Sequence, residues 1–349
     1  MRRVLLWMVA LGAAAPTGLS LVGSSGCDGG AEAPCVDLEL LKGWAAPPGN
    51  VAVYFTVDTC AGEPVPGLVP DDFDISEDGL TVPPAQGNQT ILNASIGFRV
   101  RTVLVLGLSG SVLESRPELL AAARTFVERT VADDSEVAVY VFDGAPTMQR
   151  IVDFTADATV LRDGIDSLST WEPRDLSTDL HGAILEGLGV LDAAAPIPIS
   201  LDAVRAGGMV LFTDGTDRAA RHTQEEAQAA VDSTRHFVMT IGLGGAIDRA
   251  GLERFGKDGS EFAAGAEALG TAFERTADRV RRMSGRYYVL GYCSPSRSGA
   301  HTMELRVEGR RGELRFRFDA AGFGGLCDPN PTGADAGAGA GGDGDAGGT

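Results

Sequence analysis

The stretch VLVLGLSGSVLES (residues 103–115) decides the fold. A run of branched apolar residues ends abruptly at Gly107, and Ser109 and Ser111 follow it two residues apart. An uninterrupted apolar run of this kind is typical of a strand that is buried on both faces of a parallel sheet. Similar runs alternate with helical patterns over residues 101–283. We therefore predict an α/β fold with a doubly wound, mostly parallel sheet and helices on both of its faces.

The segments on either side predict a second, smaller domain. Short alternating stretches such as VAVYFTVDT (residues 51–59) are typical of strands. We expect residues 35–99 and 286–327 to be two β-rich flanks of an α/β domain at residues 100–285. Each flank needs a partner for its apolar face, so we expect the two flanks to pair with each other.

The first residues of the chain predict export and processing, and the last residues predict disorder. Residues 1–26 have the charged start and short apolar run of a signal peptide. The small residues before Cys27 resemble a bacterial lipoprotein cleavage box, with Ser24 where that pattern usually has an aliphatic residue. The resemblance implies lipid attachment at Cys27, and hence an exported cell-envelope protein held on the membrane by a tether at residues 27–34. Ordinary secretory cleavage that leaves Cys27 free is the alternative. The Gly/Ala/Asp tail at residues 328–349 has too few apolar residues to order itself.

Four further cysteines predict two disulfides. If Cys27 carries lipid, an even number remains, which in an exported chain indicates a disulfide framework. All four lie in the β-rich flanks, which form the smaller domain with the greater need for covalent support. Local pairs would close a loop within each flank, whereas crosswise pairs would tie the flanks together, and both remain open. The residues are Cys35, Cys60, Cys293 and Cys327.

The charge balance argues against nucleic acid as a partner. The chain has 29 Lys and Arg against 48 Asp and Glu, a net charge of −19. Nucleic-acid binding depends on basic side chains that neutralise phosphates. We therefore expect no nucleic-acid partner.

Four polar residues fall where strands of the predicted sheet end. Ser109 and Ser111 follow the first strand, Thr178 opens a helix, and Asp214 ends the strand MVLFTD. Ligands of open α/β sheets bind beyond the carboxyl ends of the strands. Hydroxyl and carboxylate oxygens suit a hard divalent cation such as Mg²⁺ or Ca²⁺.

This layout resembles the von Willebrand factor type A domain and its metal-ion-dependent adhesion site. That site consists of an Asp-x-Ser-x-Ser loop, a Thr on a second loop and an Asp on a third. Ser109, Ser111, Thr178 and Asp214 match these positions, and the resemblance covers about residues 100–285. It implies a non-enzymatic module that binds a protein or surface ligand, with Mg²⁺ or another divalent cation at the site. The flanks are similar to those of bacterial secreted proteins in which a small β domain brackets the A domain.

Gly107 departs from the pattern, because it stands where the family has the first Asp. That Asp supplies half of the site's fixed negative charge, and its loss costs roughly 1.5–3 kcal/mol. Asp179 and Glu114 are nearby carboxylates that could compensate. An Asp restored at Gly107 should bind cation if the other groups converge, and should only add strain if the backbone there excludes side chains. The competing interpretation is a vestigial site whose serines merely cap a turn and a helix.

Two further functional classes deserve comparison. Gly107-Leu108-Ser109-Gly110-Ser111 is similar to the Gly-x-Ser-x-Gly elbow of serine hydrolases, but Ser111 replaces the second glycine. His181, the one histidine near a strand end, falls inside a helix, where a partly buried structural role outweighs a base role. A hydrolase using Ser109 and a purely structural envelope protein therefore remain as alternatives to the binding module.

Overall fold

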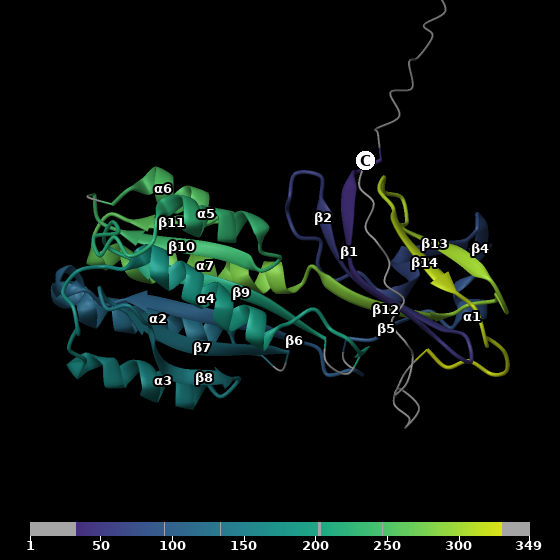
Figure 1. Ribbon diagram of the computed structural model, residues 1–349, viewed down its shortest axis with the longest axis horizontal. Helices are drawn as coiled ribbons and strands as arrows, with labels where there is room; N and C mark the ends of the chain where they lie inside the picture. The colour runs from purple at the N-terminus through teal and green to yellow at the C-terminus, as the bar shows by residue number, and fades with distance from the viewer. Residues whose placement is uncertain (1–32, 94, 133, 202–203, 246, 330–349) are drawn as a thin grey trace, which may run out of the picture. The chain divides into compact units, whose positions relative to one another are not determined.

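The computed structural model describes residues 33–93, 95–132, 134–201, 204–245 and 247–329 (Figure 1). The expected signal peptide, Cys27, most of the tether and nearly all of the tail lie outside these residues. Within the described ranges, no helix combines the length and the apolar character that a membrane span requires.

The central sheet has six strands in the order β11-β10-β9-β6-β7-β8. All neighbouring pairs are parallel except β7 and β8, whose short connection has no room for the crossover that a parallel pair needs. The predicted doubly wound, mostly parallel sheet is thus confirmed. Its strands are β6 (Arg99–Gly107), β7 (Ser135–Phe142), β8 (Gln149–Thr155), β9 (Arg205–Thr213), β10 (Phe237–Leu243) and β11 (Ser260–Ala263).

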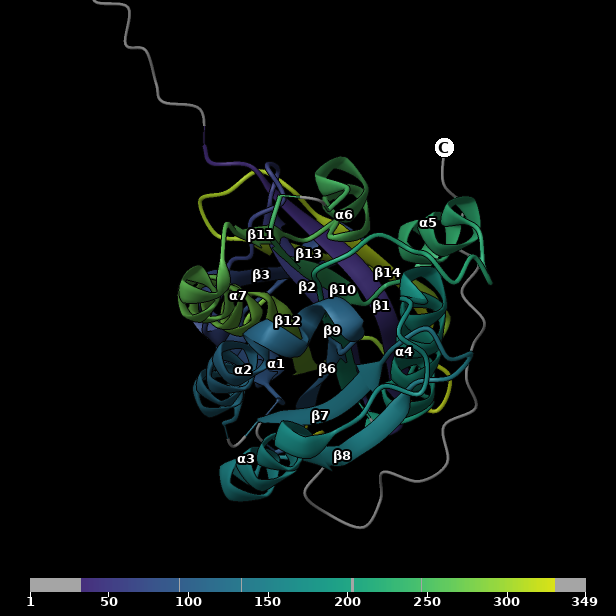
Figure 2. The same ribbon diagram turned by 90° about the vertical axis from the view of Figure 1, so that its left-hand side faces the viewer.

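Helices cover both faces of this sheet (Figure 2). On one face, α2, α3 and α7 form a core that includes Phe126 and Phe273, and on the other, α4, α5 and α6 form a core that includes Met209 and Phe255. Because the strands are buried on both sides, their sequences are apolar without alternation. The helices are α2 (Arg116–Thr130), α3 (Ala158–Ser167), α4 (Leu180–Ala194), α5 (Gln224–Ser233), α6 (Arg249–Phe255) and α7 (Leu269–Ser284).

Two four-stranded antiparallel sheets pack on each other around a second core. The first has the order β1-β2-β12-β5 and the second the order β14-β13-β3-β4. Their strands are β1 (Val36–Ala46), β2 (Asn50–Thr59), β3 (Phe73–Glu77), β4 (Leu80–Val82), β5 (Thr90–Ile91), β12 (Tyr287–Cys293), β13 (Ala300–Val307) and β14 (Leu314–Asp319), with a short helix α1 (Pro84–Gly87).

Both flanks contribute strands to both of these sheets. The β12 strand pairs with β2, with Leu290 opposite Val53, and β13 pairs with β3, with Leu305 opposite Ile75. The expected pairing of the two flanks is therefore confirmed.

The four cysteines form two local disulfides. Cys35 is bonded to Cys60 and Cys293 to Cys327, at sequence separations of 25 and 34 residues. Each bond closes a loop within one flank. The crosswise pairing that the sequence left open does not occur.

Candidate functional site

The candidate site lies where the parallel strands of the central sheet end. Gly107 ends β6, Phe142 ends β7 and Thr213 ends β9. Figure 2 looks along these strands. Because parallel strands have their carboxyl ends at one edge, the segments that follow them gather there.

Three of the four predicted residues converge at this edge. The Oγ atoms of Ser109 and Ser111 lie 3.1 Å apart. Burial raises the pKa of Asp214, and hydrogen bonds from the Ser111 and Ser109 hydroxyls to its carboxylate oppose that rise. Ser109 makes no capping hydrogen bond to the 3-10 turn Gly110–Ser115 that follows it. Its hydroxyl faces Ser111 and the Asp214 carboxylate instead.

Thr178 lies on the adjoining loop. Its carbonyl oxygen accepts hydrogen bonds from the N–H groups of Arg218 and Ala219 at 2.9 and 3.0 Å, which hold the segment after β9 beside it. Its Oγ1 lies 3.7 Å from the position of a Cβ atom on Gly215, the neighbour of Asp214. The residue is only 4% exposed, but its Oγ1 is not among the fully buried side-chain atoms that lack a partner, so this hydroxyl is open to solvent. The hydroxyl is therefore accessible to a ligand at this edge.

Residue 107, where the resembled family has its first Asp, has no free space for a side chain. A Cβ atom on Gly107 would lie 2.9 Å from the carbonyl oxygen of Phe212 and 3.0 Å from the ring of Phe142. The backbone of Gly107 is not in the left-handed region, so the obstacle is space alone. A side chain there requires its neighbours to move.

The side chains of Asp179 and Glu114, the two carboxylates that could compensate for the missing Asp, form no hydrogen bond with the predicted site residues that the structure describes. Asp179 is the N-cap of α4 and accepts a hydrogen bond from Gly182 N at 3.2 Å, and Glu114 lies exposed on the 3-10 turn. Within the described part of the chain, no three His, Cys, Asp or Glu side chains are grouped to hold a metal ion. A divalent ion at the four predicted residues would meet oxygen ligands with a single negative charge. The donor set therefore does not fit a tightly held divalent cation.

Asp143, which the sequence analysis did not single out, organises this edge. It follows β7, is 0% exposed, and accepts hydrogen bonds from the N–H groups of Ala145, Arg174 and Asp175 at 2.8, 2.6 and 3.3 Å. Arg174 also pairs with it through its guanidinium at 3.2 Å. The signal was available, because the Phe-Asp-Gly after this apolar run parallels the Thr-Asp-Gly at Asp214. Asp143 thereby fixes the loop that ends in Thr178.

A second arginine braces the same loops. Arg221 donates to the carbonyl oxygen of Gly144 at 3.0 and 2.9 Å, and its Nε lies 3.7 Å from Asp179. The loops after β7 and β9 and the start of α4 are therefore linked, which makes this edge a preorganised surface.

His181 lies in the first turn of α4, as a partly buried side chain. Its Nδ1 lies 3.0 Å from the carbonyl oxygen of His222 and 3.7 Å from Asp217. Ser109 faces Ser111 and Asp214 instead. The structural role expected for His181 agrees with these contacts.

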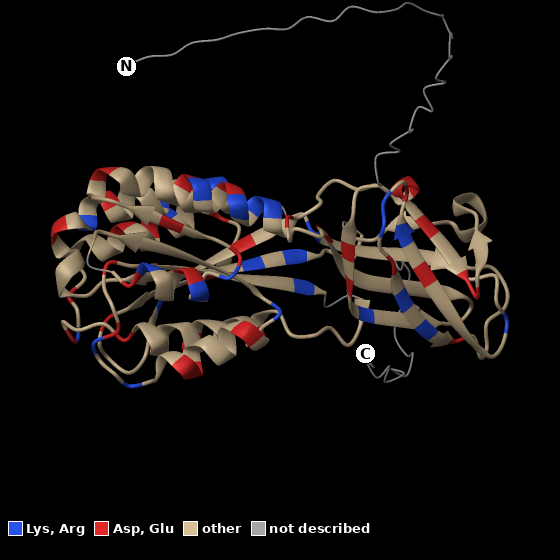
Figure 3. Cartoon of the chain, turned by 90° about the horizontal axis from the view of Figure 1, so that it is seen from above, with Lys and Arg blue, Asp and Glu red and all other residues tan. Residues whose placement is uncertain are grey.

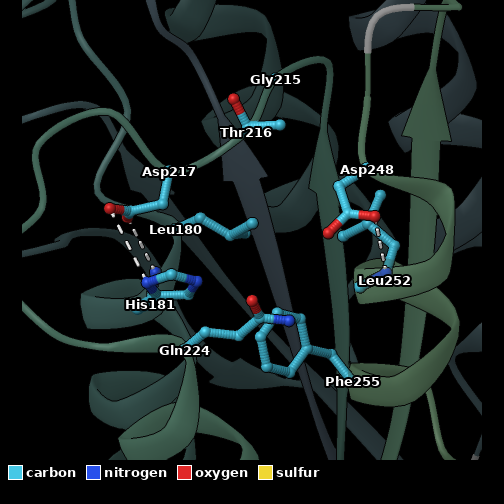
Figure 4. A pocket seen from close by; sticks show the side chains of 10 residues that line it. Leu180, His181, Gly215, Thr216, Asp217, Gln224, Asp248, Leu252 and Phe255 are labelled. Carbon is cyan, nitrogen blue, oxygen red and sulfur yellow. Dashed lines mark hydrogen bonds and ion pairs between the residues drawn. The ribbon is translucent and has the colours of Figure 1, made fainter.

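His181 also lines a cavity of about 170 Å³ beside the site, and Figure 4 shows its walls. The loop after β9 and the first turns of α4, α5 and α6 surround it. The lining residues are Leu180, His181, Gly215, Thr216, Asp217, Gln224, Asp248, Gly251, Leu252 and Phe255.

Comparisons with known proteins add a likeness in fold. No family model and no curated protein matches the chain. A von Willebrand factor type A protein from Catenulispora acidiphila matches with a TM-score of 0.45 and 11% identity, over 84% of this chain and 74% of that one. The pilus adhesin SpaC from Lactobacillus rhamnosus GG matches with a TM-score of 0.44 and 12% identity, over 82% of this chain and 47% of the adhesin. Proximal thread matrix protein 1 from the mussel byssus, whose metal-ion-dependent adhesion site is occupied by zinc, matches with a TM-score of 0.41 and 15% identity. The match covers 60% of this chain and 50% of the mussel protein.

The solved structures that match the chain therefore include von Willebrand factor type A domains, the family that the strand-end residues resemble. These identities describe a likeness in fold alone.

Proposed function

We propose that this protein is a binding module that recognises a protein or surface ligand at the strand-end edge of its central sheet. The grouping of hydroxyls around Asp214 carries the proposal: Ser109 and Ser111 lie at its carboxylate, and the Thr178 hydroxyl lies 3.7 Å from the Cβ position of Gly215, the next residue. A ligand with hydrogen-bond donors and acceptors would satisfy Thr178 and Asp214 together.

Two exposed leucines border these polar groups. Leu176 is 69% exposed and lies against Gly110, and Leu113 on the 3-10 turn is 39% exposed. Apolar side chains around a polar centre are typical of protein-binding surfaces. This favours a protein partner over a small polar ligand.

The charge of the chain indicates the sign of the partner surface. Figure 3 shows acidic residues, in red, on both the helical part and the antiparallel sheets. Arginines form ion pairs within the chain, such as Arg101–Glu136 at 2.8 Å and Arg129–Asp278 at 3.0 Å. These arginines are neutralised within the chain, whose net charge is −19. A basic partner surface is therefore the complementary one.

Recognition is proposed to proceed without a resident divalent cation. If Mg²⁺ bound, Asp214, Ser109, Ser111 and Thr178 would hold it, and one carboxylate would leave its charge half neutralised. The proposal therefore assigns these four residues to direct contact with the partner.

The proposed setting is the cell envelope. We propose an exported chain with an α/β binding domain at residues 100–285 carried on the paired flanks, and a lipid on Cys27. The two disulfides support an oxidising compartment. Cys27→Ser should leave the precursor unacylated and unable to partition into detergent, and normal partitioning of this variant would contradict the anchor.

Photo-crosslinking tests the binding surface. A photoreactive residue at Leu176 in the full-length chain should capture one envelope protein, and Asp214→Asn should abolish this capture. The same probe at Leu80, which is 76% exposed on β4, is the matched control and should not capture that protein. Equal capture from both positions, or capture that survives Asp214→Asn, would contradict the proposal.

A further inference from the structure

The cavity beside the strand-end edge is rich in hydrogen-bond acceptors. Asp217, whose side chain is 7% exposed, accepts hydrogen bonds from the N–H groups of His181 and Ala220 at 3.2 and 2.9 Å. On the other side, Asp248 accepts one from Gly251 N at 3.0 Å through Oδ1, while its Oδ2 has no hydrogen bond with any described residue. Figure 4 shows the two carboxylates on opposite sides of the cavity.

His181 adds a further acceptor. Its Nδ1 lies 3.0 Å from the carbonyl oxygen of His222, and a carbonyl can only accept, so Nδ1 carries the proton. In the neutral ring, Nε2 is then an acceptor, and Figure 4 shows this nitrogen turned toward the cavity. The cavity therefore offers acceptors from two walls.

His181 is the only basic side chain among the lining residues, and its Nδ1 lies 3.7 Å from Asp217. The lining contains neither Lys nor Arg. Arg249, next to Asp248, lies over the ring of Phe262 at 4.3 Å, and Arg221 donates to Gly144. A cation would therefore complement the carboxylates that line the cavity.

The base of the cavity is apolar. Leu180, Leu252 and Phe255 are 4%, 2% and 2% exposed and form part of its lining. Long basic side chains bury their methylene stems against such surfaces while their charged heads reach polar groups, and a guanidinium also packs against aromatic rings.

We propose that this cavity receives an arginine side chain of a protein partner. A guanidinium has five N–H donors and no acceptor, which matches a lining of Asp248 Oδ2, His181 Nε2 and the side chains of Thr216 and Gln224. The inference rests on the proposed function, since the cavity shares Gly215 with the strand-end edge, and it makes arginine an anchor of the same interface.

A titration with a minimal ligand tests this inference. N-acetyl-arginine amide is added to the full-length, isotope-labelled chain, and the backbone amide resonances of Gly215, Asp217 and Gly251 are followed by NMR. We expect saturable shifts at these three amides. N-acetyl-citrulline amide, which has nearly the same shape without the charge, should bind at least tenfold more weakly.

A charge-removing variant locates the binding. Asp248→Asn keeps an N-cap side chain on α6 and should weaken binding of the arginine ligand about tenfold. Asp157→Asn alters the N-cap of α3, which accepts hydrogen bonds from Thr159 and Val160, and should leave the affinity unchanged. Equal binding of arginine and citrulline ligands, an unchanged affinity in Asp248→Asn, or an absence of saturable shifts would each overturn the inference.

The outcome is separable from that of the crosslinking experiment. If the arginine ligand fails to bind while Asp214→Asn still abolishes partner capture, only the arginine cavity is wrong. If the ligand binds as expected while capture at Leu176 survives Asp214→Asn, the strand-end proposal is wrong and the cavity remains a cation site.

Discussion

The ring of Phe142 lies 3.0 Å from the position that a Cβ atom on Gly107 would occupy. The two residues are partners in the parallel pair of β6 and β7. The aromatic ring therefore fills the space next to the strand end at which the resembled family has its first Asp. The site lacks room as well as charge.

Gly107→Asp should lower the stability without creating a cation site. Overpacking against Phe142 and the Phe212 carbonyl should cost about 1–3 kcal/mol, measured as a lower melting temperature that Mg²⁺ and Mn²⁺ do not raise. Gly107→Ala is the control, and a similar loss there assigns the cost to the Cβ atom. A rise in melting temperature with Mn²⁺ in Gly107→Asp, lost again in Asp214→Ala, would show that the strand end opens to a metal.

Thr178→Val separates binding from stability. Because the Thr178 hydroxyl is open to solvent, its removal should change the unfolding free energy by less than about 0.5 kcal/mol in urea denaturation, while partner capture at Leu176 is lost. Thr276→Val is the matched control, since Thr276 Oγ1 donates to Ala272 O at 2.9 Å. That variant should lose about 1 kcal/mol and retain capture. Full capture by Thr178→Val would remove this hydroxyl from the interface.

Asp58 should make the protein less stable as the pH rises. Burial raises the pKa of Asp58 from 3.8 to about 6, although Arg286 beside it opposes the rise. Asp58 is easier to keep protonated in the folded chain than in the unfolded chain. Its contribution to the free energy of unfolding is therefore fully present below about pH 4 and is lost as the pH rises through about 6. Asp58→Asn has a neutral side chain at every pH. Its free energy of unfolding should therefore rise relative to that of the wild type by roughly 2–3 kcal/mol between pH 4 and pH 7. A difference in melting temperature that stays constant over this range would contradict the shift.

Each disulfide should stabilise the β sandwich separately. Loops of 25 and 34 residues correspond to about 3.5–4 kcal/mol each in the unfolded chain. The double variants Cys35→Ala/Cys60→Ala and Cys293→Ala/Cys327→Ala should lose similar amounts, and peptide mapping without reduction should recover only the local pairs. Peptides that join the first flank to the second would refute this connectivity.

The sequence was informative where local pattern reflects the environment of one element. Buried strands such as β6 and β9 are apolar without interruption, so their ends, and with them Ser109 and Asp214, could be located. The β1 strand was not singled out, because its register with β2 shifts between Leu40 and Lys42 and its burial does not alternate. A bulge erases the period on which strand prediction depends.

Properties that depend on distant segments could not be predicted. The obstacle at Gly107 comes from Phe142 and Phe212, on two other strands. The cavity that contains Asp217 and Asp248 forms only when α4 and α6 meet the loop after β9. The cysteine pairing likewise depends on where the flanks fold, and spacing alone left three possibilities.

The pairing of β2 with β12 sets the order of events during synthesis. The entire α/β part emerges from the ribosome between these two strands, so the sheet that contains β2 cannot close until residues 287–293 exist. Until then β2 has one open edge, which is prone to pair with other chains. A nascent or truncated protein that ends before Tyr287 therefore exposes half of a sandwich core. Its solubility depends on whatever shields that strand until the last flank arrives.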